Sequence, residues 1–181
     1  MISRERALEM LRAEIPQVNL IKHVIAVEAV MRGLARRLGG EEEVWSRAGL
    51  LHDLDYARTV DNPEKHARLA VEMLKDELPA DALQAILAHC GHVPAVSMMD
   101  KAIRCADPVT GLITASALMH PSRKLEGINV GFLAKRFKEK RFAAGADRDQ
   151  IAECRNVGLE LDEFLGLALD SMRESSGELG L

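Results

Sequence analysis

Apolar residues along the chain recur three or four positions apart. The clearest run lies between residues 20 and 38. One face of that segment collects Leu20, Val24, Val27, Met31, Leu34 and Leu38. Such a stripe is typical of a helix that packs against a core. No segment shows the strict alternation of β-branched or aromatic residues with polar ones that marks a half-buried strand. The pattern predicts an all-α protein.

Residues that start and stop helices divide this pattern into segments. Asn19 is a good N-cap for the second helix, and glycines 39 and 40 end it. Pro63 suits the first position of a helix that carries His66. Pro108 interrupts a long apolar segment and predicts a kink. The predicted helices span about residues 3–14, 19–38, 41–52, 63–74, 79–89, 97–119, 130–140 and 148–172, and residues 174–181 are expected to be frayed.

The length of 181 residues fits a single domain. A net charge of −4 argues against general nucleic-acid binding. Residues 122–141 nevertheless hold seven Lys or Arg, which we interpret as a solvated helix face. The three cysteines form no CxxC motif, and no segment resembles a signal peptide or a membrane span. We therefore expect reduced thiols, a cytoplasmic location and no membrane partner.

Histidines and acids fall at inward-facing or helix-end positions. Taken singly, each has a simple structural explanation. His23 on an apolar face could be a core histidine bonded to a carbonyl, and Asp107 before a proline could cap a helix. His89 could interact with a helix dipole, and Asp53 and Asp55 could be loop acids. The candidate set contains His23, His52, Asp53, His66, His89 and Asp107.

The combination of these residues points to a shared role. A buried polar group without a partner costs about 1–3 kcal/mol. Six such groups on separate helices would be destabilising unless one ligand satisfied them together. A metal ion is such a ligand, because imidazole nitrogens and carboxylate oxygens bind it directly. The sequence therefore indicates a metal centre.

The order of these residues, H…HD…D, resembles the HD superfamily of metal-dependent phosphohydrolases. The matching segments are NLIKHVIAVEAVMRGLARRLG, WSRAGLLHDLDY and DKAIRCADPVTGLITASAL. They are similar to small, stand-alone HD-domain proteins, and the resemblance covers about residues 16–155. It implies a single HD-type domain over residues 1–181. Its fold would be a helical bundle of about five core helices with flanking N- and C-terminal helices.

The resemblance also implies a ligand for each position. His23, His52, Asp53 and Asp107 would hold a first divalent ion. Asp53 would bridge to a second ion, which His66 and His89 would complete. His92 is an alternative to His89, because both lie in the segment HCGH. The mixed nitrogen and oxygen donor set suits Mn, Fe, Co, Ni or Zn, and Mg less well.

Such a centre implies hydrolysis of a phosphate ester by metal-activated water. The expected substrate is a small phosphorylated molecule such as a nucleotide, and both monoesters and diesters remain open. Asp53 and Asp55 are the candidate catalytic residues, and Lys101 and Arg104 are candidates to bind the substrate phosphate. Two alternatives remain: a catalytically inactive nucleotide-sensing module and a di-iron oxygenase. A homo-oligomer is compatible with the sequence.

Overall fold

The computed structural model describes all residues from 1 to 181, and its ordered elements are helices and turns. The prediction of an all-α fold is confirmed. The α-helices are α1 Arg4–Glu14, α2 Val18–Leu38, α3 Glu42–Leu51, α4 Tyr56–Thr59, α5 Arg68–Leu74, α6 Ala80–His89, α7 Met98–Met119, α8 Val130–Lys138, α9 Arg148–Ala152, α10 Leu161–Glu174 and α11 Ser176–Leu179. Short 3₁₀ turns cover Pro63–Lys65, Leu125–Gly127 and Glu153–Val157.

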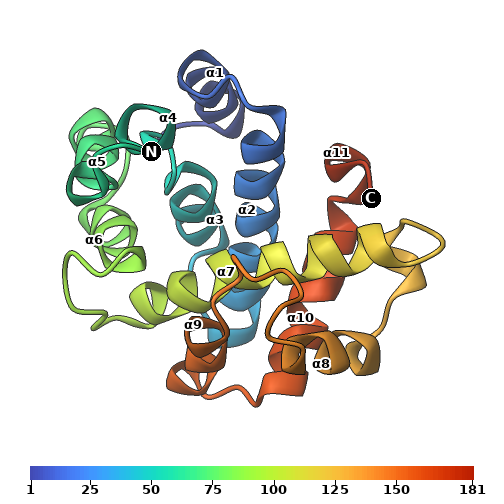
Figure 1. The fold of residues 1–181 in the computed structure, drawn as a ribbon. Coiled ribbons are helices and arrows are strands. Elements are labelled where there is room, and N and C mark those ends of the chain that lie inside the picture. Colours follow the sequence, from blue (N-terminus) through green and yellow to red (C-terminus); the bar gives the residue numbers. More distant parts are fainter.

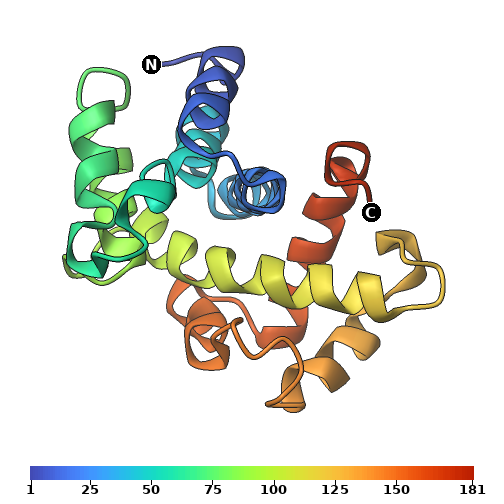
Figure 2. The same cartoon turned by 45° about the horizontal axis from the view of Figure 1, so that its top comes forward.

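The long helix α7 crosses the molecule and separates two groups of helices. The helices α1 and α3 to α6 lie on one side of it and α8 and α9 on the other, while α10 begins beside α8 and α9 and crosses α7 toward α11 (Figures 1 and 2). The stripe predicted on α2 faces inward, since Val24, Val27 and Leu34 are fully buried. The helix α2 packs against α3, α7 and α10. Segments far apart in sequence therefore meet around α2 and α7.

Capping explains where α7 begins. The Ser97 hydroxyl accepts a hydrogen bond from the Asp100 N–H, and the Asp100 carboxylate accepts the Ser97 N–H in return. The helix then continues through Pro108 to Met119. Asp107 consequently lies in mid-helix, and its alternative role as an N-cap is wrong.

The predicted start of the second helix is also wrong in detail. The helix begins at Val18 with Gln17 at the cap, and neither Gln17 nor Asn19 caps it through a side chain. Gln17 is still extended, and the helical backbone conformation begins with the next residue, Val18. The predicted end at Gly39 is confirmed, because Gly39 adopts φ 75°.

The helix predicted to begin at Pro63 is replaced by two pieces. Pro63–Lys65 forms one 3₁₀ turn, His66 is extended with ψ 143°, and α5 begins only at Arg68. Ala67 adopts φ 63°, which a continuous helix does not permit. His66 is therefore presented from a connecting segment, where its ring is free to turn toward other helices.

The single helix predicted over residues 148–172 is wrong as well. It is divided into α9, a 3₁₀ turn and α10, because Gly158 adopts φ 78° and reverses the chain. Residues 174–181 are not frayed. Residues 176–179 form α11, and Leu179 and Leu181 are buried. Their apolar side chains pack toward α2, which stabilises the segment.

No helix in the structure combines the length and the hydropathy that crossing a membrane requires.

Candidate metal centre

His52 and Asp53 lie where α3 ends, and the helix end explains why both can face the same point. His52 has helical φ and ψ at the C-cap position. Its Nδ1 lies 2.8 Å from the Gly49 carbonyl oxygen. A carbonyl only accepts, so Nδ1 carries a hydrogen and Nε2 is the nitrogen left for a ligand. That Nε2 is buried and makes no hydrogen bond. A buried polar nitrogen without a partner requires an explanation.

The other predicted ligands converge on these two residues from separate elements. His23 Nε2 from α2 lies 3.1 Å from Asp107 Oδ1 of α7. Asp107 Oδ1 lies 3.7 Å from His52 Nε2. His23, His52 and Asp107 thus place one donor atom each within 4.8 Å of one another. This is the first of two donor groups.

The second donor group surrounds Asp53. His52, Asp53 and His89 also bring their donor atoms within 4.8 Å of one another. His66 Nε2 lies 3.2 Å from Asp53 Oδ1 and 3.2 Å from His89 Nε2. The other oxygen, Asp53 Oδ2, faces His23 at 3.8 Å. Asp53 therefore lies between the two groups, with one oxygen directed toward each.

All four histidines use the same ring nitrogen, Nδ1, for a hydrogen bond with the surrounding protein. His89 Nδ1 donates to the Ile86 carbonyl, as His52 does to Gly49. His66 Nδ1 donates to Asp55 Oδ1 at 2.9 Å. For His23, the acceptor is the Thr110 hydroxyl at 3.1 Å. That hydroxyl donates its own hydrogen to the Asp107 carbonyl. Every Nε2 is thereby left facing the carboxylates.

The electrostatics of the cluster differ from one imidazole to the next. Burial opposes the protonation of His52, but Asp53 and Asp107 outweigh it and raise its pKa to about 9. For His66, burial is likewise outweighed by Asp53 and Asp55, and its pKa is also about 9. Burial and the neighbouring His52 charge lower the pKa of His89 to about 4. The cluster thus contains both protonated and neutral imidazoles near neutral pH.

The pKa values of the two carboxylates, Asp53 and Asp107, are both lowered. Burial works to raise the pKa of Asp53, but the His52 charge and the His66 hydrogen bond lower it overall. For Asp107, burial is outweighed by the close His23 imidazole and by the positive charge of His52, and its pKa is lowered well below the usual range. Both acids are therefore ionised, which is the state that binds a cation.

Asp55, predicted to be catalytic, faces away from the centre of the cluster. It is fully buried, with Oδ1 accepting from His66 and Oδ2 accepting from the Ala70 N–H at 2.9 Å. Burial tends to raise the pKa of Asp55, but these hydrogen bonds lower it overall. These contacts indicate that Asp55 orients His66.

Of the two cationic candidates, Arg104 contacts the backbone next to His89. Arg104 donates to Glu153 at 2.7 and 2.8 Å and to the Ala88 carbonyl at 3.3 Å. Neither Lys101 nor Arg104 forms a hydrogen bond or ion pair with the cluster, so their role toward the substrate stays a prediction. His92 Nε2 lies 2.8 Å from the His66 carbonyl, which favours His89 over His92 as the inward-facing histidine.

Sequence reasoning missed Thr110 and Gly49, which orient His23 and His52. Thr110 follows Asp107 by one helical turn, and Gly49 precedes His52 by three residues. That spacing is the available signal, since residues three apart lie on one helix face.

The donor set fits a divalent metal. Metal-binding histidines usually donate their second ring N–H to a carbonyl or carboxylate, and all four rings have such a partner or a hydroxyl. Donors on adjacent corners of a metal with bonds of about 2.1 Å lie about 3 Å apart. The 3.2 Å between His66 Nε2 and His89 Nε2 is close to that value. The unpaired His52 Nε2 would also gain a partner.

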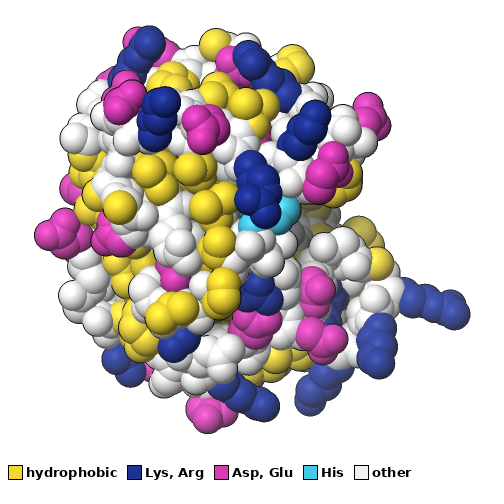
Figure 3. Space-filling view, turned by 90° about the vertical axis from the view of Figure 1, so that its left-hand side faces the viewer, with side chains coloured by type: hydrophobic (Ala, Val, Ile, Leu, Met, Phe, Trp, Pro, Cys, Tyr) yellow, Lys and Arg dark blue, Asp and Glu magenta, His cyan; other side chains and the backbone are white.

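The cluster is largely enclosed. His52 is fully buried and His89 is 5% exposed, whereas His23 and Asp107 keep side-chain exposures of 26% and 29%. On the face that carries α5 and α6, only a small area of histidine reaches the surface, beside Lys or Arg side chains (Figure 3). The accessible approach is therefore on the side of His23 and Asp107.

Comparison with known proteins adds independent evidence. A family model described as HD domain matches residues 20–110, just over half of the chain. The Ribonuclease Y of Sulfurovum sp. (strain NBC37-1) is 32% identical over 152 residues, which cover 81% of this chain and 28% of that protein. A Campylobacter jejuni (strain RM1221) Ribonuclease Y is 28% identical over 164 residues, covering 80% of this chain and 32% of that protein.

This chain spans less than a third of the length of these relatives. The family match nevertheless contains every member of the cluster, from His23 to Asp107, together with Thr110. The order H…HD…D, the all-α bundle and the convergence of the donors agree with that match, and the chain belongs to the HD-domain family.

Proposed function

We propose that this protein is a divalent-metal-dependent phosphohydrolase that cleaves a phosphodiester or phosphomonoester bond of a nucleotide-containing substrate. The observation that carries the proposal is the convergence of four Nε2 atoms and two ionised carboxylates at one partly open site. The similarity to proteins named Ribonuclease Y supports phosphodiester chemistry on ribonucleotides, although the chain covers only part of those proteins.

The arrangement is compatible with two ions. His23, His52 and Asp107 would hold one, while His66 and His89 would hold the other, with Asp53 directing one oxygen to each. Bound divalent ions would lower the pKa of a water molecule and neutralise charge on a phosphate. Mn, Fe, Co, Ni and Zn all accept this donor set, which contains no cysteine.

The surrounding residues have roles that do not depend on which metal is bound. Asp55 and Thr110 fix the rings of His66 and His23, so that each presents Nε2 to the centre. Burial of His52 and His89 limits access of bulk water on their side. A substrate phosphate would approach past His23 and Asp107, the two exposed members. There Lys22 is the nearest cationic candidate on α2, one residue before His23.

A metal screen tests the proposal. Purified protein would be stripped of metal and reloaded separately with Mn, Fe, Co, Ni or Zn. It would then be assayed on p-nitrophenyl phosphate, its bis ester and short oligoribonucleotides. We expect turnover with at least one metal and a loss of at least 100-fold in His52→Ala and in the near-isosteric Asp53→Asn. His120→Ala is the matched control, because His120 lies outside the cluster and pairs with Ser122.

The same screen separates the alternatives. Stoichiometric metal without turnover of any phosphate ester would contradict the proposal and favour a non-catalytic sensor. Oxygen consumption by the iron-loaded protein, absent in His52→Ala, would favour an oxygenase. Turnover unaffected by His52→Ala would show that the activity comes from another site or a contaminant.

A further inference from the structure

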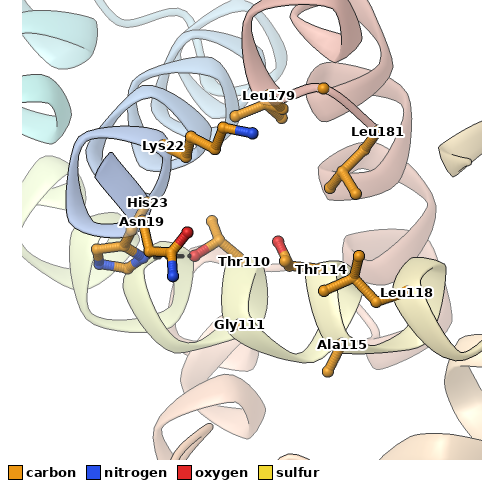
Figure 4. Close-up of a pocket in the computed structure, with 11 residues that line it drawn as sticks. Asn19, Lys22, His23, Thr110, Gly111, Thr114, Ala115, Leu118, Leu179 and Leu181 are labelled. Atoms are coloured by element: carbon orange, nitrogen blue, oxygen red, sulfur yellow. Dashed lines mark hydrogen bonds between the residues drawn. The ribbon is translucent and has the colours of Figure 1, made fainter. Parts of the chain in front are cut away.

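A second feature of the molecule lies directly beside the cluster. A cavity of about 430 Å³ is formed between α2, α7 and residues 179–181 (Figure 4). Small-molecule sites commonly enclose about 300–1,000 Å³. His23 and Thr110 line this cavity and also belong to the cluster. A molecule in the cavity would therefore lie next to the exposed side of the metal centre.

The two ends of the cavity differ in chemistry. The end near the cluster carries Asn19 and His23, the far end is formed by Leu118 and Leu181, and Lys22 lies along the wall that leads to Leu179 (Figure 4). In Figure 4, the Lys22 amine extends along one wall, and the Thr114 hydroxyl points into the space from the opposite wall. Lys22 forms no hydrogen bond or ion pair within the protein. Its charge is thus available to an anionic ligand.

The apolar end of the cavity contains a partly exposed leucine. Leu118 is 53% exposed and lines the cavity, so it offers apolar surface to a ligand there. Its side chain faces the cavity together with the buried Leu181 (Figure 4). A ligand that covered Leu118 would gain stabilisation from the apolar area removed from water.

The wall at this end also lies outside the family match. The match stops at residue 110, whereas Thr114, Leu118 and Leu181 follow it. The metal centre is thus built from the matched part of the chain, and the far wall of the cavity is built from the remainder. Residues in that wall are placed to select the group that the phosphate carries.

We propose that this cavity binds the nucleoside of the substrate, with its phosphate directed toward His23. A nucleobase has apolar faces, which suit Leu118 and Leu181, and a polar edge, which suits the Thr114 hydroxyl and the Asn19 amide. Lys22, whose flexible side chain extends along the cavity wall, turns its amine to pair with the phosphate. The inference rests on the proposed function only for the position of the phosphate.

Equilibrium binding tests this assignment without requiring turnover. Adenosine, AMP, inorganic phosphate and octyl phosphate would be titrated calorimetrically into Mn-loaded protein. We expect AMP to bind at least 10-fold more tightly than phosphate or octyl phosphate. Leu118→Glu should weaken AMP and adenosine at least 10-fold and leave phosphate within 2-fold. Met119→Glu is the matched control, because Met119 is the next residue of α7, is 66% exposed and does not line the cavity.

A second pair of variants tests the phosphate contact. Lys22→Gln should weaken AMP and phosphate by similar factors of about 5 to 10 and leave adenosine unchanged. Lys75→Gln, at an exposed position away from the cavity, should change none of them. Octyl phosphate binding more tightly than AMP, or AMP binding unchanged in Leu118→Glu, would overturn the nucleoside assignment. If the protein hydrolysed no phosphate ester but bound adenosine, and Leu118→Glu abolished that binding, the proposed function would be refuted and the nucleoside site would be supported.

Discussion

The Asp55 carboxylate joins His66 to the start of α5. One oxygen accepts from His66 Nδ1 at 2.9 Å, and the other accepts from the Ala70 N–H at 2.9 Å. Ala70 is the third residue of α5, where helix N–H groups lack partners within the helix. One buried side chain therefore caps a helix and sets the direction of a predicted metal ligand.

This relationship predicts the behaviour of Asp55→Asn. The new amide can satisfy only one of the two donors, so His66 loses its fixed orientation or α5 loses its cap. We expect about 10- to 100-fold weaker binding of the more loosely held ion, measured by chelator competition. Asp61→Asn, at an exposed loop position, is the control. Affinity unchanged in Asp55→Asn would contradict a positioning role.

Metal binding should release protons. Because the pKa values of His52 and His66 are about 9, both rings are protonated at pH 7 in the metal-free protein. A metal binds the neutral ring, so loading both sites should release about two protons at pH 7 and fewer above pH 9. Affinity should therefore rise with pH and level off near pH 9. Titration calorimetry in buffers of different ionisation enthalpy measures this number, and zero release would contradict the account.

A buried ion-pair network should dominate the stability of the first three helices. Glu28 is 1% exposed and accepts from Arg4, Arg32 and Arg47 at 2.9 to 3.0 Å. Glu28→Ala would leave Arg47 buried without its main partner. We expect a loss of about 3–5 kcal/mol in the free energy of unfolding, measured by urea titration.

The exposed pair of Arg6 and Glu9 provides the comparison for that variant. Exposed ion pairs contribute little, so Glu9→Ala should leave the urea midpoint almost unchanged. Equal changes in the free energy of unfolding for Glu28→Ala and Glu9→Ala would show that burial does not determine how much an ion pair contributes.

Close packing of α2 against α3 makes Gly49 sensitive to substitution. A Cβ added there would lie 2.9 Å from Met31 Cγ and 3.0 Å from the Val27 carbonyl oxygen. Gly49→Ala should therefore cost about 1–3 kcal/mol of stability and weaken metal binding, because the Gly49 carbonyl also holds His52. Gly177→Ala is the control, since a Cβ there meets nothing within 4 Å. A stable Gly49→Ala with normal affinity would contradict this packing argument.

The sequence predicted much of the helical framework, because apolar spacing and capping residues are local signals. The bounds of α1, α3 and α6 follow them closely. Local signals failed at His66, where contacts with Asp55 and His92 hold an extended backbone that proline alone suggested was helical. They failed again after Arg148, where Gly158 divides the predicted helix.

For the candidate site, too, part could be predicted from the sequence and part depends on contacts between distant residues. The H…HD…D order, through its resemblance to the HD superfamily, selected residues that converge in the structure, and their metal binding stays a prediction. A capping role for Asp55 was one reading of the sequence, but the helix that it caps could not be identified, because the contact is with Ala70, fifteen positions away in the sequence. Glu28 also gave no local signal, since a glutamate on a helix usually faces solvent and its arginine partners come from three helices.

The most direct test of the account is a crystal structure of the Mn-loaded protein with anomalous diffraction data. We predict one anomalous peak within about 2.0–2.4 Å of His23 Nε2, His52 Nε2 and an Asp107 oxygen, and a second peak near His66 Nε2 and His89 Nε2. Rings turned to other partners, with no anomalous density between them under Mn excess, would contradict the assignment of a metal centre.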